Sequence, residues 1–168
     1  MKKILMISAV ILAICLTVTA VSADDGWSFN FSSSESSNSD GGAMSFENGK
    51  LKLQDVELTI PDGFQENKSM QKLSQDAEDI DNAKYSLCQF VKDGKEIVVK
   101  VFFFENGEDF LNLTPVDNEV QKTIEGVDGV YDSNRYGDGT PTFRFLKDGK
   151  IVEVNAPDDD TIASVLKH

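Results

Sequence analysis

The chain has 168 residues, of which 16 are Lys or Arg and 29 are Asp or Glu, so its formal net charge is −13. This length fits one ordinary domain with an appendage, and a hydrophobic content of 40 % excludes wholesale disorder. The acidity excludes nucleic acid as a partner, because phosphate binding needs clustered Lys and Arg. The single His, His168, excludes His-based catalytic triads and metal sites built from several His.

Residues 1–23 have the pattern of a signal peptide or an N-terminal membrane anchor. Two lysines precede the uncharged residues 4–23, and Val21 and Ala23 supply the small side chains of a signal cleavage site. A stretch of this length is also just sufficient for a spanning helix. We therefore expect a secreted or cell-surface protein, which contacts the membrane only through residues 4–23 if the signal is not cleaved.

Residues 24–43 predict a flexible tether. Seven of the twenty residues are Ser, three are Gly and four are acidic, a composition that buries too little apolar surface to become ordered. Trp27, Phe29 and Phe31 alternate within it as in a short strand. They form either a loosely packed aromatic cluster or a patch that docks on a partner.

Residues 44–168 predict a single α+β domain in which tight hairpins build the sheet. A turn with Asp-Gly or Asn-Gly at its centre is the strongest short-range hairpin signal, because a type I′ turn needs positive φ at both central residues. Such turns lie at Asn48-Gly49, Asp93-Gly94 and Asp148-Gly149. The strands that they join are predicted at residues 44–46 and 51–53, 85–91 and 96–104, and 142–146 and 151–155.

Two-residue turns fix the register of the last hairpin. Because side chains alternate between the two faces of a strand, Phe145 faces Val152 on an apolar side of the sheet. Arg144 then faces Glu153 on the other side, where we expect a solvent-exposed ion pair.

The same argument places Cys88 opposite Val99, on an apolar face. We therefore expect a buried and unreactive thiol. Cys15 is removed with a cleaved signal, so the remaining chain has no second cysteine for an intramolecular disulfide.

Three helices are predicted from the spacing of apolar residues. The first covers residues 67–81, the second covers residues 116–124 with Asp117 as its N-cap, and the third contains residues 162–166. Further strands are predicted at residues 56–60 and near Tyr131. The expected architecture is an antiparallel sheet with about three helices packed mainly on one face.

The loop at residues 128–139 is the candidate metal site, with calcium as the ion. From Asp132 onward it begins like an EF-hand loop, but Tyr136 and Phe143 stand where that loop has its fifth and twelfth ligands. An acidic surface loop without a metal is therefore the favoured interpretation. The candidate ligands are Asp128, Asp132, Asn134 and Asp138.

Other motifs carry little chemistry. The run Asp158–Asp160 fits the N-terminus of a helix better than a metal site. The motifs of serine hydrolases, zinc proteases, dithiol redox sites and phosphate-binding loops do not occur. Three N-glycosylation sequons begin at Asn30, Asn67 and Asn112.

Two segments carry a resemblance to a known group. The first is Val56 to Ile60 followed by Pro-Asp-Gly-Phe, and the second is the aromatic strand from Thr142 with its turn, partner strand and short helix. Over about residues 51–167 the chain resembles small, uncharacterised exported α+β domains of methanogenic archaea. The first segment is also similar to the PsbP/Mog1-like sandwich. The resemblance implies an archaeal exported domain and supplies no catalytic residues.

The sequence therefore predicts a non-enzymatic extracytoplasmic module, either a binding domain or a component of the cell envelope. Its expected partner is a protein or a small ligand of unknown identity, without a cofactor. The alternatives are a calcium-stabilised extracellular domain and an enzyme of unrecognised type.

Overall fold

The computed structural model describes residues 43–78, 80–116 and 118–167. The chain divides into two units, Met1–Ser37 and Asn38–His168, and every described residue belongs to the second. The predicted signal or anchor, the aromatic residues of the tether, Asn30 and Asp117 lie outside the described residues. Within the described ranges, no helix combines the length and the hydropathy that a membrane span requires.

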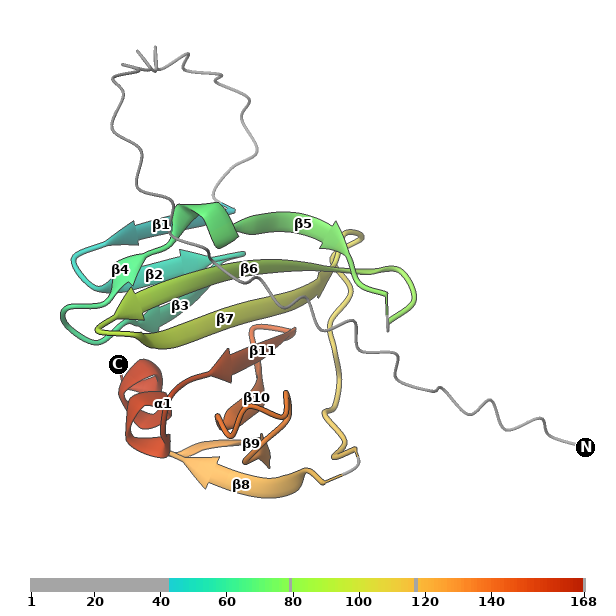
Figure 1. The fold of residues 1–168 in the computed structure, drawn as a ribbon. Coiled ribbons are helices and arrows are strands. Elements are labelled where there is room, and N and C mark those ends of the chain that lie inside the picture. Colours follow the sequence, from blue (N-terminus) through green and yellow to red (C-terminus); the bar gives the residue numbers. More distant parts are fainter. Residues whose placement is uncertain (1–42, 79, 117, 168) are drawn as a thin grey trace, which may run out of the picture. The chain divides into compact units, whose positions relative to one another are not determined.

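The described residues form eleven strands in two antiparallel sheets (Figure 1). The small sheet has the order β1-β2-β3, with β1 at Met44–Glu47, β2 at Lys50–Leu53 and β3 at Val56–Thr59. The large sheet has the order β4-β6-β7-β11-β10-β9-β8, and β5 also pairs with β6. Its strands are β4 (Gln65–Glu66), β5 (Lys72–Asp76), β6 (Ala83–Lys92), β7 (Lys95–Phe104), β8 (Val120–Ile124), β9 (Val127–Asp132), β10 (Thr142–Lys147) and β11 (Lys150–Asn155).

The three predicted hairpins are confirmed, with their predicted registers. Asp93 and Gly94 have φ of 50° and 75°, as a type I′ turn requires, and the other two turns have the same pattern. Phe145 pairs with Val152, and Arg144 pairs with Glu153. Two further turns with positive φ at both positions close hairpins that the sequence analysis did not identify, at Gln54-Asp55 and at Glu125-Gly126.

One face of the large sheet contributes to the core, which it shares with the small sheet and with α1 (Asp159–Leu166). Strands of the large sheet contribute alternate residues, as expected for a sheet with one buried face. The fully buried core side chains include Leu51, Val56, Phe90, Val99, Phe143 and Ile162. We call this the core face and the opposite side of the large sheet the outer face.

The predicted α+β class is wrong, because the described part of the chain is mostly strand and contains a single α-helix. Residues 67–81 form a short 3₁₀ helix at Lys68–Met70 and strand β5. The ten-residue β6 leaves a long edge, and β4 and β5 both pair with it. Edge pairing thus overrides the helical spacing of Met70 and Leu73, which are partly exposed.

The second predicted helix is also wrong. Residues 120–124 form β8, which pairs with β9 through the turn at Glu125-Gly126. Val120 and Ile124 fit the spacing of a helix, and they equally fit one face of a strand. The third predicted helix is confirmed as α1, where Asp158 is the N-cap and its side chain accepts a hydrogen bond from the Thr161 backbone N–H.

Candidate functional site

The outer face of the large sheet carries a set of charged and phenolic side chains that surround two buried carboxylates. We call this set the Glu119 cluster, and its members are Glu119, Arg135, Tyr136, Arg144 and Glu153. Arg144 lies on β10 and Glu153 on β11, whereas the other three lie on the segments that join β7 to β8 and β9 to β10. These two segments cover part of the outer face.

Glu119 is the centre of the cluster. Its side chain is 2 % exposed, and both carboxylate oxygens accept a hydrogen bond from Nη2 of Arg144, at 2.6 and 2.5 Å. Arg135 donates to the same carboxylate through Nη1, and the backbone N–H of Val116 donates to Oε2 at 2.9 Å. Two guanidinium groups and one backbone amide therefore compensate this buried charge.

Glu153 is the second buried carboxylate, with a side chain that is 6 % exposed. The hydroxyl of Tyr136 donates to its Oε1 at 2.5 Å, and Nε of Arg135 lies 3.6 Å from its Oε2. Burial of the hydroxyl and the negative charge of Glu153 raise the pKa of Tyr136. Arg135 thus joins the two carboxylates.

Arg144 and Glu153 are cross-strand neighbours, as predicted. The prediction that they form a solvent-exposed ion pair is wrong, because both side chains are largely buried. The covering segments remove both side chains from bulk water, and each finds a partner from those segments. The sequence analysis missed Glu119 and Arg135 because neither belongs to a hairpin whose register it could assign.

The chemistry of the Glu119 cluster favours a positioning role. Both carboxylates accept hydrogen bonds from cationic or phenolic donors, so neither is arranged as a general base. Among the described side chains, Nε of Arg144 is the buried polar atom that lacks a hydrogen-bond partner. Apolar packing alone does not bury the two long connecting segments. The cluster fixes them on the outer face of the sheet.

The same two segments and the adjoining strand expose large apolar side chains. We call Val116, Tyr136 and Val120 the apolar rim, with exposed fractions of 56 %, 49 % and 55 %. Val116 and Tyr136 lie on the covering segments, and Val120 lies on the core-face side of the edge strand β8. Val116 donates its backbone N–H to Glu119, and Tyr136 is itself a member of the Glu119 cluster through its hydroxyl. Leu111 lies on the same connecting segment as Val116 and is 88 % exposed. Exposed apolar side chains next to a fixed polar framework are typical of protein-binding surfaces.

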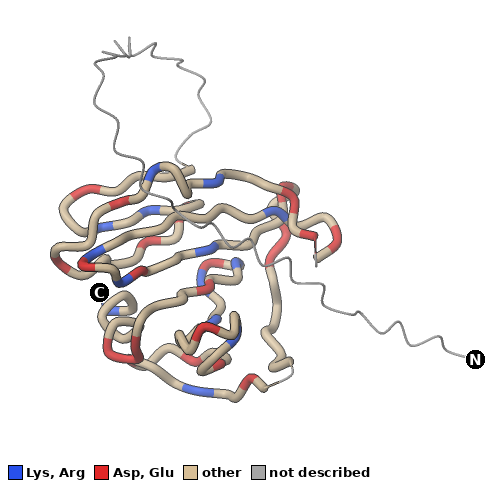
Figure 2. The backbone as a smooth tube through the Cα atoms, in the orientation of Figure 1, with Lys and Arg blue, Asp and Glu red and all other residues tan. Residues whose placement is uncertain are grey.

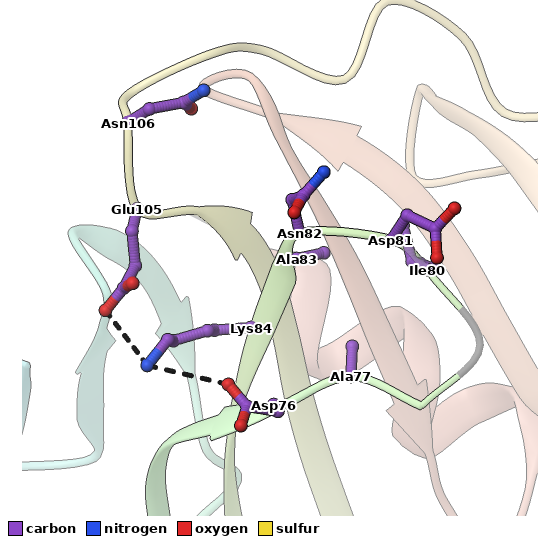
Figure 3. Close-up of a pocket in the computed structure, with 9 residues that line it drawn as sticks. All are labelled: Asp76, Ala77, Ile80, Asp81, Asn82, Ala83, Lys84, Glu105 and Asn106. Atoms are coloured by element: carbon purple, nitrogen blue, oxygen red, sulfur yellow. Dashed lines mark ion pairs between the residues drawn. The ribbon is translucent and has the colours of Figure 1, made fainter.

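A pocket of about 550 Å³ lies where the turn between β5 and β6 meets the end of β7. Figure 3 shows the ammonium of Lys84 between Glu105 and Asp76, at 3.0 and 3.6 Å. The hydrogen bond that Lys84 donates to Glu105 raises the pKa of Lys84, although partial desolvation opposes this. Because both carboxylates pair with this amine, the ion pairs fasten the turn to the end of β7.

The structure engages each candidate calcium ligand in its own local hydrogen bond. Asp132 Oδ1 accepts a hydrogen bond from the Asn134 backbone N–H, and Asn134 Oδ1 accepts one from the Gly139 N–H. Asp138 Oδ1 accepts from the hydroxyl and the backbone N–H of Thr140, which lower the pKa of Asp138. The fourth candidate, Asp128, accepts from the hydroxyl of Thr123 on β8. Within the described ranges, no three His, Cys, Asp or Glu side chains gather as a metal site.

The two described sequons differ in exposure. Asn67 is half-buried and its side-chain amide donates to Oε1 of Gln89 at 2.7 Å, so its nitrogen is engaged. Asn112 is exposed on the segment between β7 and β8. Asn112 is therefore the more accessible of the two glycosylation candidates.

Cys88 is buried on the core face, as predicted. Its Sγ lies 3.9 Å from the carbonyl oxygen of Val99. Burial, with a smaller contribution from the negative charge of Glu66, raises the pKa of the thiol to about 12. A thiol in this state is a poor nucleophile.

Comparison of the chain with models of protein families, with characterised proteins and with solved structures found no match.

Proposed function

We propose that this chain is a non-enzymatic, extracytoplasmic module that binds a partner protein through the apolar rim. The observation that carries the proposal is the link between the rim and the Glu119 cluster. Val116 and Tyr136 expose apolar surface, while polar groups of the same two residues are bound by buried carboxylates.

This arrangement lowers the conformational-entropy cost of binding a partner. Loops that are ordered only in a complex add an ordering cost, whereas loops held in place beforehand do not. The bonds to Glu119 come from three positions in the sequence: Val116, Arg135 and Arg144. The rim is therefore presented in one geometry before a partner arrives.

The charge of the chain indicates the kind of partner. A formal charge of −13 steers basic surfaces toward the protein and repels acidic ones. Figure 2 shows Asp and Glu at many of the turns of the described chain, on several sides of the strands. We infer a partner whose contact surface combines apolar side chains with Lys or Arg.

The extracytoplasmic location is part of the proposal and rests on the signal-like pattern of residues 1–23. Export also makes Asn112 available to glycosylation. Because Asn112 lies on the same connecting segment as Val116, a glycan there would border the binding surface.

Site-specific photocrosslinking in cells that produce the full chain tests the proposal. A photoreactive phenylalanine analogue replaces Val120 in one variant and the exposed Lys68, on the 3₁₀ helix, in the control. We expect a discrete crosslinked protein at position 120 that is absent at position 68, and its loss when Val116→Ser is added. Identical products at both positions, or none at position 120, would contradict the proposal.

A further inference from the structure

The strand β8 is a regular sheet edge. It is the terminal strand of the large sheet in the described part of the chain, and all five of its residues pair with β9 in unbroken register. The other edges of this sheet differ, because β4 has two residues and the pairing of β5 with β6 is interrupted by a register shift. Long regular edges pair readily with another strand unless they are blocked.

The turn at Glu125-Gly126 determines which groups of β8 face outward. In a two-residue hairpin the pair next to the turn, here Ile124 and Val127, exchanges both backbone hydrogen bonds. Alternation then directs the N–H and C=O groups of Gln121 and Thr123 away from β9. These two residues therefore offer the hydrogen bonds that an added strand would use.

The charged side chain of β8 does not block this edge. Lys122 projects toward the core face, where its Nζ donates to Oδ2 of Asp159 at 2.7 Å and lies 3.7 Å from the centre of the Tyr131 ring. An ammonium bound to Asp159 does not extend past the strand, so it leaves the outward backbone groups of Gln121 and Thr123 unobstructed. Here α1 and β9 hold the ammonium over the sheet.

We propose that a partner protein adds an extended segment to the edge of β8, as a further strand of the large sheet. This inference rests on the proposed function and names its binding mode. The added strand would place alternate side chains on the two faces of the sheet. On the core-face side it meets Val120, and on the outer-face side it meets Thr123 and, beyond it, Asp128. The segment that fits alternates apolar side chains with Lys or Arg.

A second copy of this chain fits the edge less well. When β8 pairs antiparallel with its own copy about its centre, Val120 faces Ile124 and the two Lys122 residues face each other. Each chain brings a net charge of −13, so two copies repel each other. We therefore assign the edge to a basic partner segment.

The test uses the ¹⁵N-labelled full chain and two capped heptapeptides, Val-Lys-Val-Lys-Val-Lys-Val and its counterpart with Glu in place of Lys. With the Lys peptide we expect shifted resonances and slower hydrogen exchange for the backbone amides of Gln121 and Thr123. The Glu peptide should leave both amides unchanged, because the acidic chain repels it. Gln121→Pro removes one outward N–H and should weaken binding at least tenfold, whereas Gln121→Ala keeps that N–H and should bind as the parent does.

Four outcomes would overturn the inference: no response to the Lys peptide, equal responses to both peptides, undiminished binding by Gln121→Pro, or concentration-dependent dimerisation that protects the same amides without peptide. If Gln121→Pro does not fold, the amide responses of the parent chain still decide. The photocrosslinking at position 120 separates the two proposals. Crosslinks without a response of the edge amides would reject strand addition alone, and the absence of both would reject the binding function as well.

Discussion

Arg144 and Glu153 face each other across β10 and β11, yet their charged groups bind partners from two different connecting segments. The guanidinium of Arg144 binds Glu119, while the carboxylate of Glu153 binds Tyr136 and lies close to Arg135. This cross-strand pair therefore lies at the base of a buried network of side chains, beneath the two connecting segments. The network determines where the long segments of this β protein lie.

Glu119→Gln should be strongly destabilising. It removes the negative charge that two guanidinium groups share at a position 2 % exposed to solvent. Breaking a buried ion pair from one side costs about 3–5 kcal/mol, because the remaining charge is left uncompensated. We expect a loss of that order in the free energy of unfolding, measured by urea denaturation at pH 7.

Glu125→Gln is the matched control, since Glu125 pairs with Lys167 at 3.7 Å and both side chains are well exposed. Its expected effect is below about 1 kcal/mol, as for other surface pairs.

The Glu119→Leu, Arg144→Leu double variant should lose less unfolding free energy than the sum of the losses of the two single variants. Additive losses in this cycle would show that the two residues are not coupled.

Gly129→Ala should also destabilise the chain, for a steric reason. A Cβ at this position on β9 would lie 2.3 Å from the carbonyl oxygen of Arg144 and 2.6 Å from the ring of Phe143. Neither neighbour can move freely, because one is backbone and the other is a fully buried core ring. Overpacking of this kind costs about 1–3 kcal/mol. Gly107→Ala, where a Cβ meets nothing within 4 Å but φ is +77°, is the comparison for backbone strain alone. A loss at Gly129 no larger than the loss at Gly107 in thermal melts would refute the steric argument.

Hairpins were the predictable part of this fold. Asp93-Gly94 and Asp148-Gly149 specify their turns through local chemistry, and a two-residue turn then fixes the partner of every residue in the two strands. The turn at Gln54-Asp55 has the same geometry without a glycine, so its residue types gave no comparable signal. Local rules thus predict a hairpin only where the turn residues are the favoured ones.

The second predicted helix was wrong because the four-residue spacing of its apolar side chains is ambiguous. Val120 and Ile124 lie on one face of a helix and also on one face of a strand, and two residues cannot separate the periods. The deciding contact is the hairpin with β9, whose turn at Glu125-Gly126 the sequence analysis did not identify. The Glu119 cluster, by contrast, is long-range, because Glu119 lies 25 residues from Arg144 in the sequence. A signal was nonetheless available in the register, which placed Arg144 and Glu153 on one face and left open what would cover them.

Cys88 should react very slowly with a disulfide reagent such as Ellman's reagent in the folded protein. Its thiol is buried on the core face and its pKa is raised to about 12, so almost no thiolate exists at pH 8. The measurement uses the Cys15→Ser variant, in which Cys88 is the remaining thiol, with the same protein in 6 M guanidinium as the fully reactive reference. Labelling of the folded protein within seconds would contradict this expectation.

Calcium should leave the stability of the protein unchanged. The side-chain oxygens of Asp132, Asn134 and Asp138 already accept hydrogen bonds from their own turns, so a cation would have to break those bonds to gather them. Ca²⁺ takes six to eight oxygen ligands from a converging site. Melting curves in millimolar calcium and in chelator should coincide. A rise of more than a few degrees with calcium, lost in Asp132→Ala, would instead support the calcium-stabilised alternative.

Asp158→Ala should destabilise the chain by about 1 kcal/mol at neutral pH, the usual cost of removing a helix N-cap. The carboxylate of Asp158 accepts hydrogen bonds from the hydroxyl and the backbone N–H of Thr161, and these bonds lower its pKa below the ordinary value of 3.8. A carboxyl group whose pKa is lower in the folded state stabilises the fold above its unfolded pKa, and this contribution disappears as the pH falls through the folded pKa.

The difference in unfolding free energy between the parent chain and Asp158→Ala should therefore be constant near pH 7 and shrink below about pH 4. Urea titrations of both proteins between pH 7 and pH 2.5 measure it. Asp160→Ala is the control, because Asp160 lies in the same helical turn and its side chain does not cap the helix. It should show only the smaller dipole effect of about 0.3–1 kcal/mol. A difference for Asp158→Ala that persists unchanged at pH 2.5 would mean that its carboxylate charge contributes nothing to the cap.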